Sequence, residues 1–215
     1  MPRRLYLLRH GQTDANLSGI IQGQSSDDNP LNKEGLRQAD FSAETLATTP
    51  ISCIYTSPAL RTKQTAEKIR KHHMPTVSIT VLPDLLEINF GVFEGKTVKE
   101  IEDLYPDLAE TYREKPSECI FPKGESIATA LERVGRAVNT IIMNNTKNEN
   151  ILIVSHGGVM ALIFVYLFGL DIDKIFQAIR HGNCGLSIID LEGLILGKVT
   201  NKPRIVCMND LSHLR

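Results

Sequence analysis

The stretch Leu5-Tyr6-Leu7-Leu8-Arg9-His10-Gly11 decides the fold that we expect for this 215-residue chain. Its apolar part is typical of a buried strand, and the polar triplet follows directly where that strand ends. A similar unit lies far along the chain, where the apolar residues 151–154 precede Ser155-His156-Gly157-Gly158. We therefore expect two buried strands that each carry polar residues at the carboxyl end.

The rest of the chain alternates between short apolar runs and amphipathic segments of helix length. Further strands are predicted over residues 52–56, 77–82, 186–191 and 205–208. Helices are predicted from an N-cap at Asn32, over residues 60–72, from an N-cap at Ser126 to residue 142, and after His156. Residues 96–123 are charged and less regular. This alternation favours one α/β domain over residues 1–215, with helices on both faces of a sheet.

Composition excludes several classes of function. Lys and Arg number 24 against 25 Asp and Glu, so no global positive field exists to bind nucleic acid or an anionic membrane. The longest apolar stretch, residues 159–170, is too short to span a bilayer, and the first apolar run is too short for a signal peptide. The cysteines show no zinc-like spacing, so we expect no metal and a reducing, cytoplasmic location. They are Cys53, Cys119, Cys184 and Cys207.

Three polar clusters are expected to meet at one edge of the sheet. Arg9-His10-Gly11 ends one strand, residues 57–61 follow a second, and His156 follows another. Reactive groups in such sheets gather at the carboxyl ends of the strands. The sequence therefore predicts a single site built from segments that are distant in the chain.

The residue types in these clusters suit a phosphate monoester. Arg9 and Arg61 offer planar guanidinium groups that form paired hydrogen bonds with phosphate oxygens. Gly11 and Gly157 permit close approach of the backbone, and a helix that begins near Gly157 offers free N–H groups to an anion. His10 is a candidate nucleophile, because the neighbouring Arg9 favours its neutral form. A backbone carbonyl is one candidate for fixing its tautomer.

The leaving oxygen of such an ester needs a proton. Glu87 lies among apolar neighbours that raise the pKa of a carboxyl group, so we expect it to act as the acid and later as the base. Arg9, Arg61 and His156 are expected to stabilise the charge of the transition state. This chemistry requires neither a metal nor a cofactor.

These residues resemble the histidine phosphatase superfamily, in its phosphoglycerate mutase-like branch. The likeness covers nearly the whole chain in the expected order. The matching segments are Leu7-Leu8-Arg9-His10-Gly11-Gln12-Thr13-Asp14-Ala15-Asn16, Gln22-Gly23, Pro30-Leu31-Asn32, Thr56-Ser57-Pro58-Ala59-Leu60-Arg61-Thr62, Leu86-Glu87, Phe90-Gly91, Glu94-Gly95, Gly124-Glu125-Ser126, Val154-Ser155-His156-Gly157-Gly158 and the closing Asn209-Asp210 to His213-Leu214.

The resemblance implies a three-layer α/β/α sandwich with a mostly parallel central sheet. It implies a phosphohistidine intermediate on His10, with Glu87 as proton donor and acceptor and a phosphate pocket of Arg9, Arg61 and His156. The substrate side would be lined by Thr13, Asn16, Gln22, Gly23 and Gly157. The chain departs from the family in residues 24–29, a loop longer than in common members. In it, Asp27 and Asp28 either disfavour a highly anionic substrate or are simply solvated.

Two features compete with this assignment. The triplet Arg180-His181-Gly182 repeats the first one, but it follows helix-spaced apolar residues and has no partner motif, so we interpret it as a structural helix end and turn. Glu94 is the second candidate for the acid.

The family contains both phosphatases and mutases. Its mutases carry a longer, Arg-rich insertion between the acid segment and the second histidine, whereas residues 96–123 here form a short cap-like insertion with Arg113 as its one arginine. A mutase must enclose its intermediate away from water. We therefore expect a hydrolase of a small phosphomonoester, with a phosphoglycerate mutase as the alternative and a non-catalytic phosphate-binding module as a third reading.

Overall fold

The computed structural model describes residues 3–73, 77–145, 150–191, 194–195, 198–199 and 203–215. Its centre is a six-stranded sheet in the order β3-β2-β4-β1-β5-β8. The strands β1 to β4 pair in parallel, whereas β5 and β8 are antiparallel to their neighbours. The bounds are β1 Arg4–Arg9, β2 Ile51–Thr56, β3 Ser78–Val81, β4 Asn150–Ser155, β5 Leu186–Asp190 and β8 Arg204–Asp210. The expectation of a mostly parallel sheet is confirmed.

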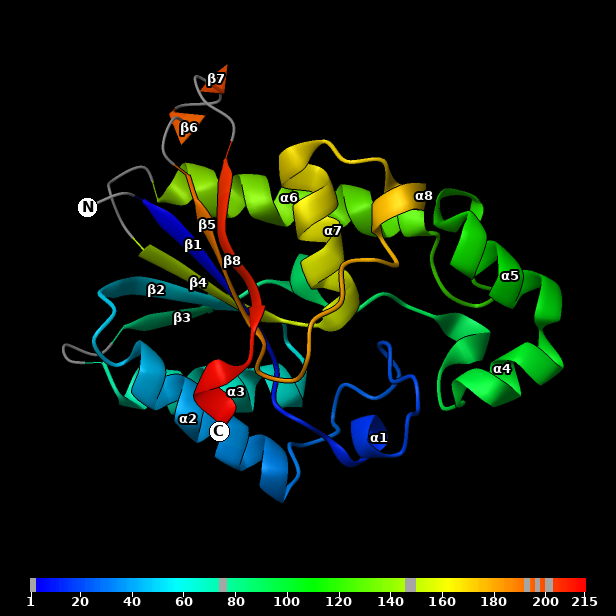
Figure 1. Ribbon diagram of the computed structural model, residues 1–215, viewed down its shortest axis with the longest axis horizontal. Coiled ribbons are helices and arrows are strands. Elements are labelled where there is room, and N and C mark those ends of the chain that lie inside the picture. Colours follow the sequence, from blue (N-terminus) through cyan, green and yellow to red (C-terminus); the bar gives the residue numbers. More distant parts are fainter. Residues whose placement is uncertain (1–2, 74–76, 146–149, 192–193, 196–197, 200–202) are drawn as a thin grey trace.

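Helices cover both faces of this sheet (Figure 1). On one face lie α2 (Lys33–Leu46) and α3 (Leu60–Lys71), and on the other lie α6 (Ile127–Asn144) and α7 (Gly157–Phe168). Alternate residues of β1 enter different cores: Leu5 and Leu7 pack with the α6 and α7 side, and Tyr6 and Leu8 pack with the α2 and α3 side. This period of two is what a strand buried on both faces requires. The fold is thus the three-layer α/β/α sandwich that the sequence predicts.

The predicted helix starts are confirmed in detail. The Asn32 side chain accepts a hydrogen bond from the Gly35 N–H at 2.8 Å, and Ser126 Oγ accepts one from the Thr129 N–H at 3.0 Å. Each side chain satisfies a backbone donor that the first helical turn leaves free. Both N-caps fix where a long helix begins on the sheet.

Residues 96–123 are more regular than their composition suggests. They form α4 (Val98–Leu104), α5 (Pro106–Glu114) and a 3₁₀ turn at Pro116–Glu118. Thr97 and Glu100 make a reciprocal capping box, and Pro106 occupies the first turn of α5. These two helices lie to one side of the sandwich, past the lower end of α7 (Figure 1).

The segment after α7 is less helical than predicted. Only Ile172–Ile175 forms a helix (α8), and residues 176–178 make a turn that leads back toward the sheet. Shorter elements that the sequence analysis did not predict complete the described structure: α1 Asp14–Leu17, β6 Leu194–Ile195, β7 Lys198–Val199, and 3₁₀ turns at Pro83–Leu85, Gly91–Phe93 and Ser212–Leu214. Within the described residues, none of the helices is long and apolar enough to cross a membrane.

Candidate active site

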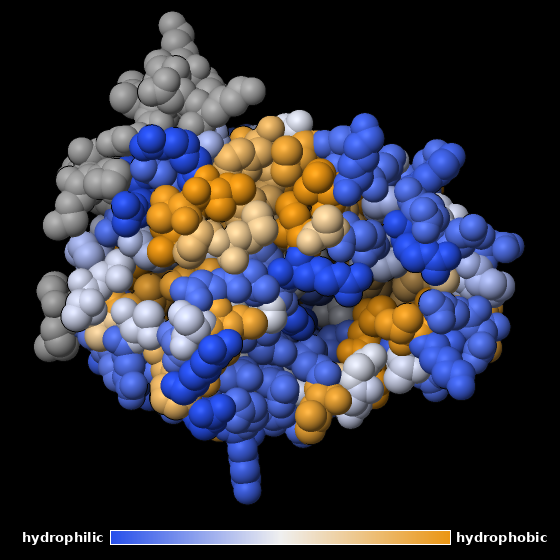
Figure 2. Space-filling view, in the orientation of Figure 1, coloured by the Kyte–Doolittle hydropathy of each residue, from blue (hydrophilic) through white to orange (hydrophobic). Residues whose placement is uncertain are grey.

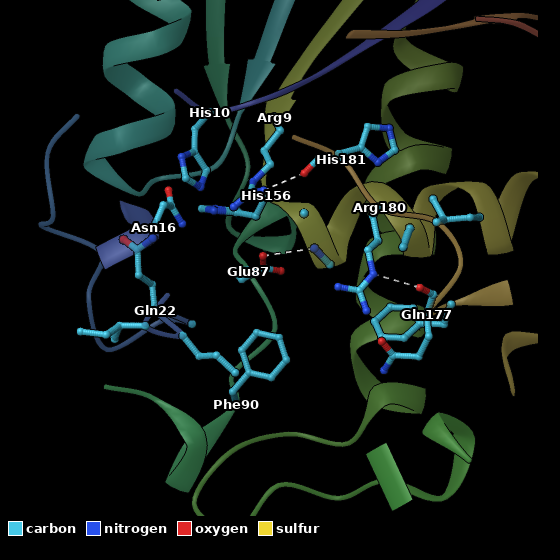
Figure 3. Close-up of a pocket in the computed structure, with 18 of the residues that line it drawn as sticks. Arg9, His10, Asn16, Gln22, Glu87, Phe90, His156, Gln177, Arg180 and His181 are labelled. Atoms are coloured by element: carbon cyan, nitrogen blue, oxygen red, sulfur yellow. Dashed lines mark hydrogen bonds between the residues drawn. The ribbon is translucent and has the colours of Figure 1, made fainter. Parts of the chain in front are cut away.

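The predicted polar clusters meet in one cavity of about 350 Å³ at the carboxyl ends of the parallel strands. Arg9 ends β1 and His10 follows it, Arg61 lies in the first turn of α3 after β2, and His156 follows β4. All four side chains line the cavity together with Glu87. Figure 3 labels Arg9, His10, His156 and Glu87 among them. Figure 2 shows the molecule hollowed on this face, with hydrophilic and hydrophobic side chains both at the rim. Parallel strands that end at one edge explain the convergence.

His10 is held in one tautomer. Its Nδ1 atom lies 2.7 Å from the carbonyl oxygen of Gly11, and a carbonyl oxygen only accepts hydrogen bonds, so Nδ1 carries the proton. The Nε2 atom therefore keeps its lone pair. Burial, with Arg9 and Arg61 nearby, holds the pKa of His10 well below its usual value. The ring is thus a neutral imidazole with one nucleophilic nitrogen, and the expected carbonyl partner is the one that follows it in the chain.

His156 stands beside His10 and is fully buried. The two ring centroids are 5.3 Å apart, in an edge-on arrangement. Ser57 Oγ lies 2.8 Å from His156 Nε2 and accepts a hydrogen bond from the Ala59 N–H, so its hydroxyl proton is available for Nε2. Such a bond leaves the proton of His156 on Nδ1, a buried nitrogen without a partner in the described part of the chain. Burial, followed by the charge of Arg61, keeps the pKa of His156 well below its usual value.

Arg9 and Arg61 are fixed by backbone carbonyls. Arg9 Nη1 donates to the His181 oxygen at 2.7 Å, while Arg61 donates to the oxygens of Ser26 at 2.8 Å and Gly23 at 3.0 Å. Neutral carbonyls orient these guanidinium groups without cancelling their charge. Burial lowers the pKa of both groups, because a desolvated cation is less stable than a hydrated one.

Glu87 lies beside His156 in the cavity (Figure 3), and its carboxyl group accepts two backbone hydrogen bonds. The donors are the N–H of Ile88 at 2.9 Å and the N–H of Gly158 at 3.2 Å. The first turn of α7 thus directs a free N–H at the side chain of Glu87. A Cβ atom at Gly158 would lie 2.7 Å from Glu87 Oε1, so a side chain there would displace this carboxyl group. The surroundings of Glu87 are therefore more polar than its apolar sequence neighbours suggest.

Arg133, which the sequence analysis did not single out, holds the backbone around Glu87 in position. Arg133 on α6 donates to the carbonyl oxygens of Asp84, Leu86 and Glu87 at 2.7–3.0 Å. It also forms a nearly buried ion pair with Glu125 at 2.7 Å. The backbone on both sides of Glu87 is consequently tied to the long helix α6.

Four of the five residues predicted on the substrate side line the cavity: Asn16, Gln22, Gly23 and Gly157. Thr13 is different. Its side chain is buried and caps α1, where Oγ1 accepts a hydrogen bond from the Asn16 N–H at 3.2 Å and donates to Asn16 Oδ1 at 3.1 Å. Thr13 lies outside the cavity lining and orients Asn16.

Glu94 does not line this cavity, and its carboxylate is fully used elsewhere. It accepts hydrogen bonds from the N–H groups of Gln24 at 3.0 Å, Ser25 at 2.8 Å and Phe90 at 2.9 Å. These bonds join the 24–29 loop to the segment that follows Glu87. The geometry favours Glu87 over Glu94 as the acid.

The 24–29 loop covers Arg61. The Leu60 N–H donates to the Asp27 carbonyl oxygen at 2.7 Å, and a carboxylate oxygen of Asp27 lies 3.9 Å from Arg61 Nη1. Burial raises the pKa of Asp27. Asp27 is therefore a neighbour of the phosphate-pocket arginine, whereas Asp28 is exposed.

The outer wall of the cavity comes from segments to which the sequence analysis gave no site role. Tyr112 on α5 and the residues Gln177 and Arg180 after α8 line it. The second triplet, Arg180-His181-Gly182, was expected to be structural. That holds for His181, which is buried, bonds Ser187 at 2.7 Å and orients Arg9 through its carbonyl oxygen. Arg180 also lines the cavity, a position that the sequence analysis did not predict. The repetition of the Arg-His-Gly triplet was the sequence signal that could have pointed to Arg180.

A three-layer α/β/α fold with two histidines and two arginines around one cavity defines an enzyme of phosphate chemistry. The comparisons with known proteins agree: the model of the histidine phosphatase superfamily (branch 1) matches residues 5–197. The chain belongs to that superfamily and is a phosphatase enzyme.

Individual relatives lie within the same superfamily and fold. Phosphoserine phosphatase 1 of Hydrogenobacter thermophilus is 29% identical over 189 residues, which are 88% of this chain and 87% of that one. The structure of Bacillus stearothermophilus YhfR superposes with a TM-score of 0.86 at 27% identity and covers 99% of this chain and 100% of its own. Phosphoserine phosphatase of Entamoeba histolytica, solved with 3-phosphoglyceric acid, gives a TM-score of 0.83 at 25% identity over 99% and 100% of the two chains.

Proposed function

We propose that the protein hydrolyses a small phosphomonoester, without a metal ion, through a phosphohistidine on His10. The observation that carries this proposal is the hydrogen bond of His10 Nδ1 to the Gly11 carbonyl oxygen at 2.7 Å. That bond leaves Nε2 unprotonated inside a cavity that two guanidinium groups also line. A neutral imidazole beside two cations is suited to attack a phosphoryl group that those cations hold.

In the first step, the Nε2 lone pair forms a bond to phosphorus while the bond between phosphorus and the ester oxygen breaks. Arg9 and Arg61 hold the phosphoryl oxygens, and the His156 Nδ1–H donates to one of them. Glu87, protonated at this stage, gives its proton to the leaving oxygen, so the alcohol departs neutral.

In the second step, a water molecule attacks the phosphorus of the phosphohistidine. The Glu87 carboxylate takes a proton from that water, the bond between phosphorus and Nε2 breaks, and inorganic phosphate leaves. Asn16, Gln22, Gly23 and Gly157 hold the alcohol part of the substrate, and Thr13 contributes by orienting Asn16.

The insertion 96–123 favours hydrolysis over transfer to a second hydroxyl. Tyr112 is the residue of this insertion that lines the cavity. The single arginine of the insertion, Arg113, is exposed and pairs with Glu102 and Glu114. We regard the insertion as a small cap within one domain. It brings an aromatic ring to the site rather than the cations with which a mutase would enclose its intermediate.

The expected location is the cytoplasm. All four cysteines are free thiols, and Cys119 and Cys184 are buried in the two cores. Thiols kept in this form are typical of a reducing compartment.

The proposal is tested with phosphorylated substrate and the His10→Ala variant. The wild-type protein should release inorganic phosphate from O-phosphoserine and should carry an acid-labile phosphoryl label in rapid-quench experiments. His10→Ala should lose both. Unchanged turnover in the variant would refute the nucleophile, and an isomerised product in place of phosphate would favour the mutase.

Removal of metal gives a second test. Activity should be unchanged after dialysis against EDTA, because every charge that the mechanism uses belongs to a side chain. Loss of activity that added Mg²⁺ or Zn²⁺ restores would contradict the metal-independent mechanism.

A further inference from the structure

The cavity contains a third cation, and the proposed phosphoryl chemistry does not use it. The guanidinium of Arg180 points into the cavity from the segment after α8, apart from the histidine pair (Figure 3). Its Nε–H donates to the Gln177 carbonyl oxygen at 3.3 Å, which leaves both terminal nitrogens available. Within the described part of the chain, no carboxylate pairs with this side chain.

This lack of a carboxylate partner sets Arg180 apart from three exposed arginines elsewhere on the molecule. Arg37 pairs with Glu34 at 2.7 Å, Arg136 with Asp84 at 3.4 Å, and Arg113 with two glutamates. Arg180 instead lies in a concave wall beside Phe90, Tyr112 and Phe176. Apolar surroundings reduce the screening of a charge, so an anion that enters this part of the cavity is attracted more strongly than at an open surface.

The position of Arg180 relative to the phosphoryl end is fixed by the backbone. The next residue, His181, accepts the hydrogen bond of Arg9 Nη1 at 2.7 Å. One short segment thus orients a phosphate-pocket arginine with its backbone and presents a second guanidinium with its side chain. A ligand that binds both must carry two anionic groups at a defined separation.

The hydrogen-bond donors of Arg180 indicate the chemistry of the second anionic group of the ligand. A single guanidinium with two free terminal nitrogens matches a carboxylate, which accepts two parallel hydrogen bonds and carries one charge. A second phosphate group would need several cations, and the outer wall supplies one arginine. The cavity of about 350 Å³ suits a molecule of a few carbon atoms between the two groups.

We propose that Arg180 is a specificity-determining residue that binds the carboxylate of the substrate, so that the preferred substrates are phosphate esters of small hydroxy acids or hydroxy amino acids. This inference rests on the proposed hydrolysis at His10. It adds a carboxylate subsite to that reaction.

The test compares substrates that differ only in the carboxylate. O-phosphoserine is paired with O-phosphoethanolamine, and 3-phosphoglycerate is paired with glycerol 3-phosphate. In the wild-type protein the kcat/KM should be higher for the carboxylate member of each pair. In Arg180→Gln the ratio within each pair should fall about 10- to 100-fold, as expected for the loss of a hydrogen-bonded charge. Arg180→Lys, which keeps the charge but loses the planar fork, should give an intermediate ratio.

Arg37→Gln is the matched control, because it removes the same charge from an exposed site outside the cavity and should leave both ratios unchanged. An unchanged ratio in Arg180→Gln, or an equal fall for both members of a pair, would overturn the subsite.

Binding separates this inference from the hydrolytic proposal. Calorimetry with the His10→Ala protein needs no turnover: O-phosphoserine should bind more tightly than O-phosphoethanolamine, and adding Arg180→Gln should abolish the difference. If no ester is hydrolysed and no phosphoryl label forms, the proposed function fails, and these titrations still decide the subsite. Equal binding of the two compounds by His10→Ala would refute it.

Discussion

The imidazole of His10 is anchored on its own neighbour, with Nδ1 held 2.7 Å from the carbonyl oxygen of Gly11. Gly11 is itself fixed, since its N–H donates to Thr65 Oγ1 at 3.1 Å and a Cβ atom in its place would lie 2.4 Å from the Gly35 oxygen. The imidazole of His10, the proposed nucleophile, is thus oriented by backbone packed between β1, α2 and α3, and this orientation is present before any substrate binds.

This anchor predicts an unusual protonation state that NMR can detect. In free enzyme, His10 should be the Nδ1–H tautomer, and it should not titrate between pH 8 and pH 6, because burial and the two arginines hold its pKa well below 6.5. Two-bond ¹H–¹⁵N correlation spectra of histidine-labelled protein report both properties. The His10→Gln spectrum assigns the signals.

An Nε2–H tautomer, or a midpoint near pH 6.5 for the signal that His10→Gln removes, would contradict the anchor.

The sequence predicted that the two histidines and two arginines meet, because this part of the cavity depends on short segments at strand ends. Each of Arg9, His10, Arg61 and His156 lies within a few residues of a parallel strand, and parallel strands share one edge. Local rules therefore determine both where these residues lie and that they meet. The N-caps Asn32 and Ser126 could be predicted for the same reason.

The outer wall depends on contacts that no local pattern encodes. Arg180 reaches the cavity because its segment returns from α8 to the end of β1, where His181 contacts Arg9 across 172 residues of sequence. The helical spacing of the apolar residues before Arg180-His181-Gly182 predicted a helix and gave no indication of this return to the sheet. From the sequence alone, Glu94 was a second candidate for the acid. In the structure three backbone N–H groups, two of them from the 24–29 loop, donate to its carboxylate. The helices α4 and α5 themselves did have local signals in the sequence, namely the Thr97 and Glu100 capping box and Pro106. These signals indicate where each helix begins but not that α5 contacts the cavity.

The different surroundings of Glu87 and Glu94 predict different kinetics for their amide variants. Glu87→Gln should lower kcat about 10²- to 10⁴-fold for alkyl phosphates, the range for loss of a general acid, and much less for p-nitrophenyl phosphate, whose leaving group needs little protonation. Glu94→Gln should act on both substrates alike, because an amide N–H₂ now faces a backbone donor and loosens the 24–29 loop. Parallel kcat and KM measurements on the two substrates check this.

The dependence on the leaving group is the decisive quantity in that comparison. If Glu94→Gln showed the larger effect on alkyl phosphates and Glu87→Gln affected both substrates alike, the two glutamates would have to exchange roles.

The Arg133 and Glu125 pair predicts a large loss of stability on truncation. Arg133→Ala leaves the nearly buried carboxylate of Glu125 without its counter-ion and the carbonyl oxygens of Asp84 and Leu86 without their side-chain donor, and breaking such a pair costs about 3–5 kcal/mol. Arg136→Ala, one helical turn further along α6, removes an exposed guanidinium that faces Asp84 at 3.4 Å and should cost less than about 1 kcal/mol. Urea unfolding of both variants measures the difference. Equal losses would show that the pair does not secure the acid segment.

The buried histidines predict that the protein loses stability as the pH falls below neutrality. Burial lowers the pKa of His10 and His156 well below 6.5 and that of His181 to about 4. Below pH 6.5 the unfolded chain therefore binds protons that the folded protein does not, and the free energy of unfolding must decrease with falling pH. Each such histidine contributes up to about 1.4 kcal/mol per pH unit.

Urea unfolding at pH 7.5, 6.5 and 5.5, in buffer without phosphate, should show this decrease. His181→Asn should reduce the slope by up to one proton. A free energy that stays constant over this range would contradict the burial of neutral imidazoles.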